Sequence, residues 1–409
     1  MCCYKYPESS EILVEDGKFI EIGNNLEADE TVDLGGKFVV PPFVDSHLHL
    51  DYVYTLSEMD GAQSGTLFEA IELWPEYKKT MTVEGVKRLA LRGIKDEMSH
   101  GVQYIRTHID VTDPKFTGLK AMLELREELK DKVQIQIVSF PQNGMYTYKG
   151  GVELVEEGLR MGADAVGGIP HYEPAREYGE KSIRDIVNLA KKYDKLIDVH
   201  CDETDDVMSR FVELLNALVL MEDIGIRTTA SHTCSFGSAD NSYAYRMIDL
   251  FKKSKLNFTS LPTENLYLQG RQDTYPKRRG LTRIKEFVEN GINVALGQDS
   301  INDPWYPAGN GNHMIILDNG IHAAQLMSPD DMETNLDLIT YNGAKCLNIQ
   351  DSYGFEPGKP ANFIVLNGDG PFDVIRNRAD VLASVRGGEF LFLKKPQEYE
   401  VKLNLGVQD

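Results

Sequence analysis

The sequence is poor in cysteine, in basic residues and in long apolar runs, and each shortage argues against a class of protein. Five cysteines in 409 residues follow no disulfide spacing, so we expect a reducing compartment. Lysine and arginine number 43 against 64 aspartates and glutamates, and the resulting charge of −21 argues against a nucleic-acid partner. The N-terminus lacks a signal pattern, and no apolar run reaches the roughly 18 residues of a membrane span. We therefore expect a cytoplasmic protein with neither a nucleic-acid nor a membrane partner.

What is present is ordinary for a folded enzyme or small-molecule binder. Hydrophobic residues make up 42% of the chain and charged residues 26%. A chain of 409 residues is long enough to bury one large core and a small satellite domain. Composition therefore does not indicate a particular fold or activity, and these are predicted from the order of the residues.

Short β-rich runs alternate with charge-rich helical patterns through the middle of the chain. One helical pattern covers residues 119–129, and others cover residues 183–193 and 284–291. Strand and helix repeated eight times predict a (β/α)8 barrel, which we place at residues 43–348. The eight predicted strands are residues 44–50, 104–110, 134–142, 165–172, 196–203, 227–233, 256–262 and 293–299.

The two ends of the chain differ from the middle. Residues 11–23 predict two short strands around an Asp-Gly turn. Residues 361–366 and 381–393 predict further strands, the latter broken at Gly387-Gly388. Neither end can bury an apolar face alone, so we expect a small β-sandwich built from both termini. Residues 1–42 would form its N-terminal part and residues 349–409 its C-terminal part.

One segment, residues 264–270 (ENLYLQG), resembles a protease-cleavage tag. It lies in mid-chain, between the seventh predicted strand and Tyr275-Pro276. We therefore interpret it as a native loop rather than as an expression scar.

Polar residues stand at the carboxyl ends of several predicted strands, and in this kind of barrel those ends form the active site. The first strand ends in His47-Leu48-His49, whose imidazoles share one face because side chains alternate along a strand. Such a pair by itself is as typical of two half-exposed histidines at a strand end as of two metal ligands. The other strands end in Gln142, in His200 and Glu203, in His232, and in Asp299 and Ser300.

This gathering of histidines and acids predicts a metal site. His47, His49 and His200 offer neutral nitrogen donors, and Asp299 an anionic oxygen, which leaves one position for water. A divalent ion would lower the pKa of that water toward neutrality. The fourth predicted strand contains no lysine, so a carbamylated lysine bridging two ions is not expected. We expect one divalent ion, Zn²⁺ or Fe²⁺, which suit this donor set about equally.

Several motifs resemble the amidohydrolase superfamily and, more narrowly, its bacterial cytosine deaminases. The resemblance runs from about residue 38 to the C-terminus, and residues 358–366 resemble the superfamily's sandwich strand. It implies the barrel, the sandwich and a hydrolytic deamination. The motifs that carry it are residues 41–51 (PPFVDSHLHLD), 200–203 (HCDE), 231–233 (SHT) and 298–299 (QD).

The resemblance also implies roles for individual side chains. Water activated by the metal would attack the ring carbon that bears an exocyclic nitrogen. Glu203 would protonate the adjacent ring nitrogen, Asp299 would pass a proton to departing ammonia, and His232 would hydrogen-bond the attacking oxygen. A non-catalytic binding module is disfavoured, since both Glu203 and Asp299 are retained. The residues expected to contact or shape the substrate pocket are Gln142, Phe140, Leu67, Ser300 and Trp305.

One departure from the family leaves the substrate open. The cytosine deaminases typically read His-Asp-Asp at the eighth strand, where this chain reads Gln298-Asp299-Ser300. A serine there would enlarge the pocket and remove a charge. We expect a mononuclear metal-dependent deaminase of a small heterocycle, cytosine or a close analogue such as 5-methylcytosine. The alternative is a creatinine deaminase on the same scaffold. We also expect a homo-oligomer.

Overall fold

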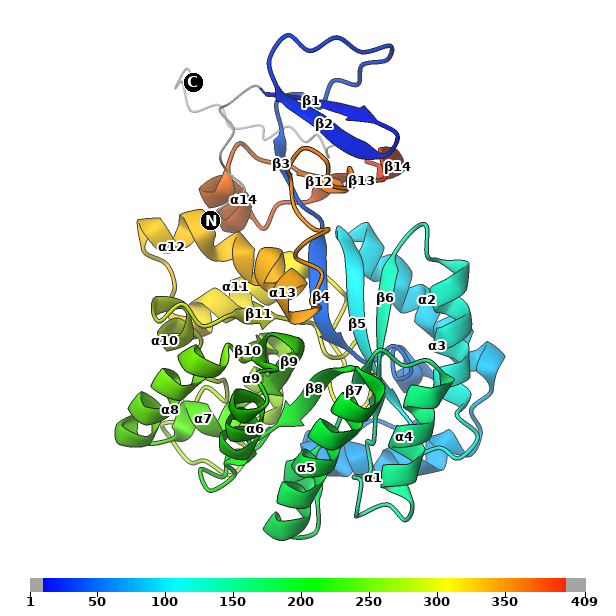
Figure 1. Ribbon diagram of the computed structural model, residues 1–409, viewed down its shortest axis with the longest axis vertical. Helices are drawn as coiled ribbons and strands as arrows, with labels where there is room; N and C mark the ends of the chain where they lie inside the picture. Colours follow the sequence, from blue (N-terminus) through cyan, green and yellow to red (C-terminus); the bar gives the residue numbers. More distant parts are fainter. Residues whose placement is uncertain (1–9, 395–409) are drawn as a thin grey trace, which may run out of the picture.

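Eight parallel strands form the central sheet of the computed structural model, which describes residues 10–394 (Figure 1). Each strand pairs with the next along the chain. All eight overlap the predicted runs, so the (β/α)8 barrel is confirmed. Cys2, Cys3 and the outer ends of both predicted terminal segments lie outside the described residues. The strands are β4 (Phe43–Leu48), β5 (Val102–Asp110), β6 (Gln134–Phe140), β7 (Ala165–Val166), β8 (Leu196–Cys201), β9 (Thr228–His232), β10 (Asn257–Ser260) and β11 (Val294–Leu296).

The barrel closes between β4 and the segment that follows β11. The amide of Asp299 donates to the carbonyl of His47 at 2.8 Å, and the amide of His49 donates to the carbonyl of Asp299 at 3.0 Å. Leu48 and Asp299 thereby form a parallel bridge. These backbone hydrogen bonds hold residues 47–49 and residue 299 side by side.

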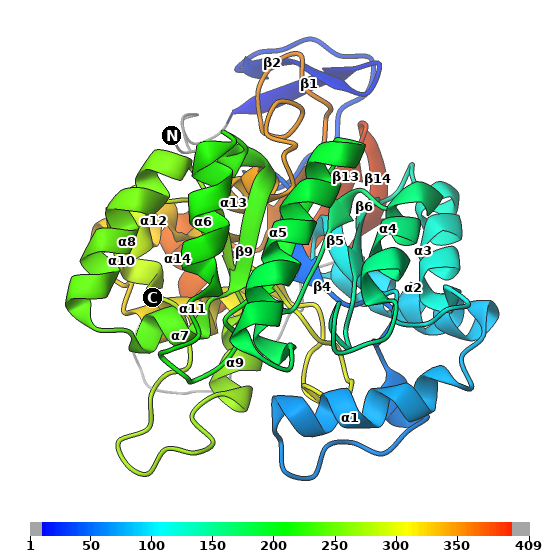
Figure 2. The same ribbon diagram turned by 60° about the horizontal axis from the view of Figure 1, so that its bottom comes forward.

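Helices surround the barrel, and α1 lies across the carboxyl ends of the strands (Figures 1 and 2). The predicted helical patterns correspond to α3, α5 and α10. Within residues 10–394 no helix is long and apolar enough to cross a bilayer. The helices are α1 (Leu67–Lys78), α2 (Val83–Ser99), α3 (Thr117–Glu128), α4 (Gly151–Met161), α5 (Arg176–Tyr193), α6 (Phe211–Met221), α7 (Cys234–Ser238), α8 (Asn241–Ser254), α9 (Pro262–Leu268), α10 (Ile284–Glu289), α11 (His313–Ala324), α12 (Pro329–Thr334), α13 (Tyr341–Cys346) and α14 (Pro371–Asn377).

The tag-like segment is a helix and not the predicted loop; its native origin stays a prediction. Most of it lies in α9, which begins at Pro262 directly after β10. Proline at the first helical turn loses no hydrogen bond and has the backbone angle that a helix needs. The helix turns the chain back over the barrel mouth, and this places its first residues at the carboxyl end of β10.

The small domain of two sheets predicted from the two terminal segments is confirmed, and it lies at the end of the barrel away from α1 (Figure 1). One sheet is the hairpin of β1 (Glu11–Glu15) and β2 (Lys18–Gly23). The second has four antiparallel strands in the order β14, β13, β12, β3, so that β3 from the N-terminal part pairs with β12 from the C-terminal part. Division of the chain after residues 42 and 348 stays a prediction. The strands of the second sheet are β3 (Phe38–Val40), β12 (Phe363–Leu366), β13 (Val381–Arg386) and β14 (Glu389–Leu393).

Phe19 of β2 joins the two sheets. Its side chain is fully buried, and its ring centroid lies 4.8 Å from that of Phe355 and 6.1 Å from that of Phe363. The neighbouring Ile20 points to solvent and is 44% exposed. The alternation along β2 therefore assigns one face of the hairpin to a shared core and the other to water.

We expect Phe19→Ala to destabilise the protein by about 3–5 kcal/mol, because it removes buried aromatic area and leaves a cavity. Urea denaturation followed by circular dichroism measures the change. Ile20→Ala is the matched control on the same strand, with an expected effect within about 0.5 kcal/mol. Equal midpoints for the two variants would show that the sheets do not share a core through Phe19.

Candidate active site

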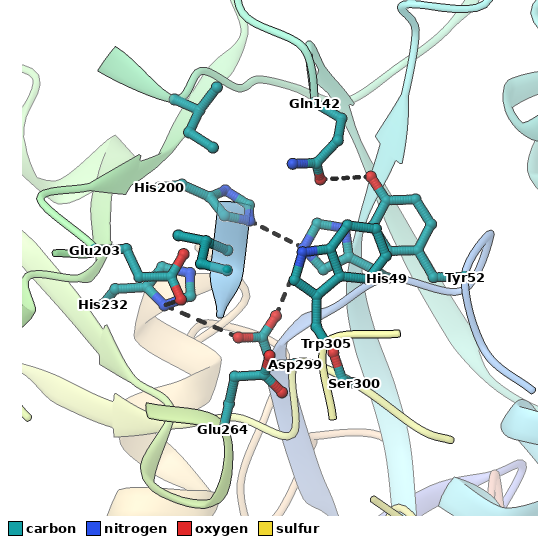
Figure 3. Close-up of a pocket in the computed structure, with 12 residues that line it drawn as sticks. His49, Tyr52, Gln142, His200, Glu203, His232, Glu264, Asp299, Ser300 and Trp305 are labelled. Atoms are coloured by element: carbon teal, nitrogen blue, oxygen red, sulfur yellow. Dashed lines mark hydrogen bonds and ion pairs between the residues drawn. The ribbon is translucent and has the colours of Figure 1, made fainter. Parts of the chain in front are cut away.

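A cavity opens at the carboxyl ends of the barrel strands (Figure 3). It collects side chains from residues far apart in the sequence. Most of the predicted site residues line it; His47 and Phe140 do not. The lining residues are His49, Tyr52, Leu67, Gln142, Ile169, His200, Glu203, His232, Glu264, Asp299, Ser300 and Trp305.

The four predicted metal ligands converge at the floor of this cavity. The Nε2 atoms of His49 and His200 lie 2.9 Å apart. The Oδ1 atom of Asp299 lies 3.5 Å from Nε2 of His47 and 3.5 Å from Nε2 of His49. Ligands about 2.0–2.1 Å from a zinc ion are themselves about 3–3.5 Å apart, so this spacing suits one ion. The cluster could therefore hold a divalent transition metal.

Burial keeps the three imidazoles neutral. It lowers the pKa of His47, of His49 and of His200 well below the usual histidine value, because a buried ring loses the hydration that stabilises its charged form. A neutral imidazole has one unprotonated nitrogen whose lone pair can bind a metal. These side chains therefore have the protonation state that a ligand needs.

A relay of hydrogen bonds orients the innermost histidine. The Ser231 hydroxyl donates to Oδ1 of Asp198 at 2.7 Å, so its oxygen is left to accept from Nδ1 of His47 at 2.9 Å. The proton of His47 then sits on Nδ1, and the lone pair of Nε2 faces the cluster. Arg106 supports the relay from below by donating to Oδ2 of Asp198 at 2.8 Å.

Asp299 and His232 both adopt left-handed backbone conformations, with φ of 69° and 66°. Residues with side chains adopt this region rarely, at a cost of about 1–3 kcal/mol. The hydrogen bonds that close the barrel hold Asp299 in place. The conformation turns the chain sharply at the end of the strand, and the carboxylate faces the cavity as a result.

Glu203 is a buried acid beside the cluster. Its Oε1 accepts a hydrogen bond from Nδ2 of Asn265 at 2.9 Å and lies 3.4 Å from Nδ1 of His232. Burial, and then the charge of Asp299, raise the pKa of Glu203 well above its usual value. Glu203 is therefore easier to protonate than an exposed carboxyl group, which is what a proton donor inside the cavity needs.

Gln142 and a stack of aromatic rings form one wall. The Tyr52 hydroxyl donates to Oε1 of Gln142 at 2.7 Å, which leaves the amide NH2 group of Gln142 available to a ligand. The ring of Tyr52 stacks on His49 at 4.7 Å on one side and on Trp305 at 4.6 Å on the other. A flat ligand would meet a flat wall with one oriented donor.

Phe140 differs from the prediction. Its ring is fully buried and stacks on the imidazole of His200 at 4.1 Å, and it does not line the cavity. Phe140 and Gln142 both point into the barrel because they are two residues apart, but Phe140 lies roughly 6–7 Å deeper. Phe140 therefore packs against His200, a predicted metal ligand, and does not face the cavity.

Sequence reasoning missed four residues of the site, Tyr52, Ile169, Glu264 and Asn265. The last two follow β10, and the rule that strand ends carry the site would have identified them. The similarity of residues 264–270 to a cleavage tag obscured that signal. Tyr52 comes just after His49, on a turn whose direction the sequence did not predict.

Glu264 changes the account of Ser300. A serine at position 300 removes one carboxyl group, but the carboxyl group of Glu264 points toward Ser300 and Asp299 at the same corner (Figure 3). Glu264 is only 2% exposed. Burial, followed by the charges of Asp299 and Asp303, raises its pKa well above the usual value. The corner therefore has a carboxyl group from another segment, and the loss of charge and gain of space expected from Ser300 stay a prediction.

Comparison with known proteins agrees with this geometry. A 5-methylcytosine deaminase from Klebsiella pneumoniae, liganded with phosphonocytosine, is 42% identical, with a TM-score of 0.93 over 97% of this chain and 98% of its own. N-isopropylammelide isopropyl amidohydrolase of Pseudomonas sp. (strain ADP) is 31% identical over 93% of both chains. Pterin deaminase of Rhizobium rhizogenes is 26% identical over 88% of this chain and 82% of its own.

The match to a family covers most of the chain. Residues 30–392 match the amidohydrolase family, a span that includes the whole barrel and most strands of the sandwich. The resemblance expected from residues 41–51, 200–203, 231–233 and 298–299 is thereby confirmed. This chain belongs to the amidohydrolase family.

Proposed function

We propose that this protein is a hydrolytic deaminase that releases ammonia from cytosine or 5-methylcytosine. The observation that carries the proposal is one cavity that joins a cluster able to hold a metal ion to the buried acid Glu203, whose pKa is raised, and to an oriented Gln142. The same arrangement belongs to a chain 42% identical to a 5-methylcytosine deaminase over nearly its whole length. A cyclic amidine presents a carbonyl, a ring nitrogen and an exocyclic nitrogen along one edge, and the cavity offers a partner for each.

One divalent ion, Zn²⁺ or Fe²⁺, would be held by His47, His49, His200 and Asp299. When bound, it supplies a water molecule whose pKa is lowered toward neutrality. The donor set supports this proposal, since the histidines are neutral and Nε2 of His47 has no other partner among the described residues. Zinc and ferrous iron fit three imidazoles and a carboxylate about equally.

The protein's own side chains would bind the ring and move the protons. The amide NH2 group of Gln142 would donate to the ring carbonyl, and Trp305 and Leu67 would enclose the ring. Glu203 would donate its proton to the ring nitrogen beside the reacting carbon, which makes that carbon more electrophilic. Asp299 would accept a proton from the attacking water and pass it to the departing ammonia.

His232 and Asn265 would hold the side chains of Glu203 and Asp299 in position. Nδ1 of His232 lies 3.9 Å from Oδ2 of Asp299 and 3.2 Å from Oδ1 of Asn265. Asn265 in turn holds Glu203. His232 would therefore hydrogen-bond the attacking oxygen from a fixed orientation, on the side of the cavity opposite the aromatic stack.

Ser300 supports 5-methylcytosine as a substrate, because a small hydroxyl leaves room beside the ring where a larger side chain would contact an added methyl group. The creatinine alternative, the cytoplasmic location and the homo-oligomer stay predictions. Ammonia release from cytosine, 5-methylcytosine, isocytosine and creatinine, assayed side by side, tests the proposal. Creatinine as the best substrate, or no activity on either cytosine, would overturn it.

We expect His200→Ala to lose bound metal, since it removes one of four ligands. Metal content by inductively coupled plasma mass spectrometry measures the loss. The matched control is His322→Ala, because His322 lies on the surface of α11 with 59% of its side chain exposed. A His200 variant that retains one ion per chain would contradict the ligand assignment.

We expect Glu203→Gln to lower kcat/KM by about 10²–10⁴-fold, because an amide cannot donate the proton that general acid catalysis needs. Metal content should stay at the wild-type level, since Glu203 is not a ligand. Steady-state kinetics and metal analysis on the same preparation make the test. Turnover within a factor of three of wild type would remove Glu203 from the mechanism.

We expect Ser300→Asp to shift preference toward unsubstituted cytosine. The larger side chain would fill the space beside the ring and place a further carboxyl group next to Glu264 and Asp303. The ratio of kcat/KM for 5-methylcytosine to that for cytosine should fall about tenfold or more, the usual effect of one methyl group on discrimination. An unchanged ratio would show that Ser300 does not contact the substituted edge of the ring.

A further inference from the structure

Glu264 is a buried acid that faces the cavity and that the proposed reaction does not use. It lies in the first turn of α9, is 2% exposed, and lines the cavity with Asp299 and Ser300. Its Oε2 atom is buried and has no hydrogen-bond partner among the described residues. A buried carboxyl oxygen without a partner is destabilising, and a ligand with an N–H group would relieve that cost.

The position of Glu264 indicates which part of the ligand it meets. In Figure 3, Gln142 and Glu264 lie at opposite ends of the cavity, with Asp299 between them. If Gln142 binds the ring carbonyl and the reacting carbon lies over the ligand cluster, the exocyclic nitrogen points toward Asp299 and Glu264. Glu264 therefore lies at the end of the cavity where the leaving group departs.

The surroundings of Glu264 leave little freedom for its carboxyl group. The residue is 2% exposed, and Trp305, which is 5% exposed, lines the same cavity. An added group on the exocyclic nitrogen of a bound ring would therefore press against the carboxyl group instead of reaching solvent.

We propose that Glu264 selects the leaving group: its carboxyl group accepts a hydrogen bond from an unsubstituted amino group and excludes an N-alkyl substituent. This inference rests on the proposed function and makes it narrower. Water and cytosine give uracil and ammonia, whereas water and an N4-alkylcytosine give uracil and an alkylamine. The reactions differ only in the group that leaves, so the residue at that end of the cavity decides between them.

The physical reason is that an alkyl group would be doubly unfavourable there. It replaces one N–H donor, and it would press against a polar oxygen that then stays unpaired and buried. Sites built to hydrogen-bond a substrate group reject analogues that lack it far more strongly than apolar pockets reject an extra methyl group. A small apolar residue at position 264 would leave no oxygen unpaired and would make room for the alkyl group.

Glu264→Ala tests the proposal, with cytosine and N4-methylcytosine as paired substrates. Uracil formation, followed by liquid chromatography, measures both reactions. We expect kcat/KM for cytosine to fall about 10–100-fold and that for N4-methylcytosine to rise, so that the preference for the free amine falls at least about 100-fold. Glu264→Gln keeps the volume and one acceptor oxygen, so it should still exclude N4-methylcytosine.

Two controls separate leaving-group selection from general damage. Pyrimidin-2-one lacks the amino group, so its inhibition constant should change less than about threefold in Glu264→Ala. Leu266→Ala changes a 40% exposed residue on the same helix and should keep the wild-type preference and metal content. A large rise in the inhibition constant of pyrimidin-2-one would instead indicate a collapsed cavity and overturn the proposal.

The outcomes for the two proposals differ. Wild-type protein that forms neither uracil from cytosine nor thymine from 5-methylcytosine would overturn the proposed function and this inference with it. Active wild-type protein, together with a Glu264→Ala variant of unchanged substrate preference, would overturn the inference alone.

Discussion

The hydrogen bonds that close the barrel are the interaction on which the rest of the site depends. Two backbone bonds join Asp299 to His47 and His49, so the seam of the barrel and the ligand cluster are the same place. A parallel barrel of this size cannot be completed without pairing its first and last strands. The stability of the fold and the geometry of the donors are therefore coupled: a shift of this seam would separate an anionic ligand from two neutral ones.

Burial then shifts the pKa of the histidines and of Glu203 around this seam. The same loss of hydration lowers the pKa of His49 and His200 and raises that of Glu203, so burial favours the neutral form of each. Beneath them, Arg106, Asp198 and Ser231 form a buried chain of hydrogen bonds that ends on His47. In this deeper layer the charges of Arg106 and Asp198 are paired with each other.

The cavity above this floor has two chemically different ends. One end carries the Gln142 amide, oriented by Tyr52, beside a stack of flat rings. The other carries Glu264 and Ser300, which come from the seventh and eighth strand ends. The proposed recognition of the ring and the proposed control of its leaving group would thus be divided between segments that are more than a hundred residues apart in the sequence.

Local sequence patterns were sufficient for the barrel, because eight β-rich runs separated by helical patterns fold in few ways, and the strand-end rule then places polar residues together. The sequence likewise predicts that His47 and His49 lie together with His200 and Asp299. What the sequence by itself determined is therefore the order of the strands and the chemistry of the residues at their ends.

Only the tertiary structure decided how deep in the barrel each side chain lies and which other segments it meets. Phe140 sits one layer below Gln142, although both point inward. The segment that resembles a tag is a helix that returns Glu264 to the corner beside Ser300. Alternation along a strand tells which face a side chain takes, but how far down the barrel it lies, and which loop folds back to meet it, depends on packing between distant segments.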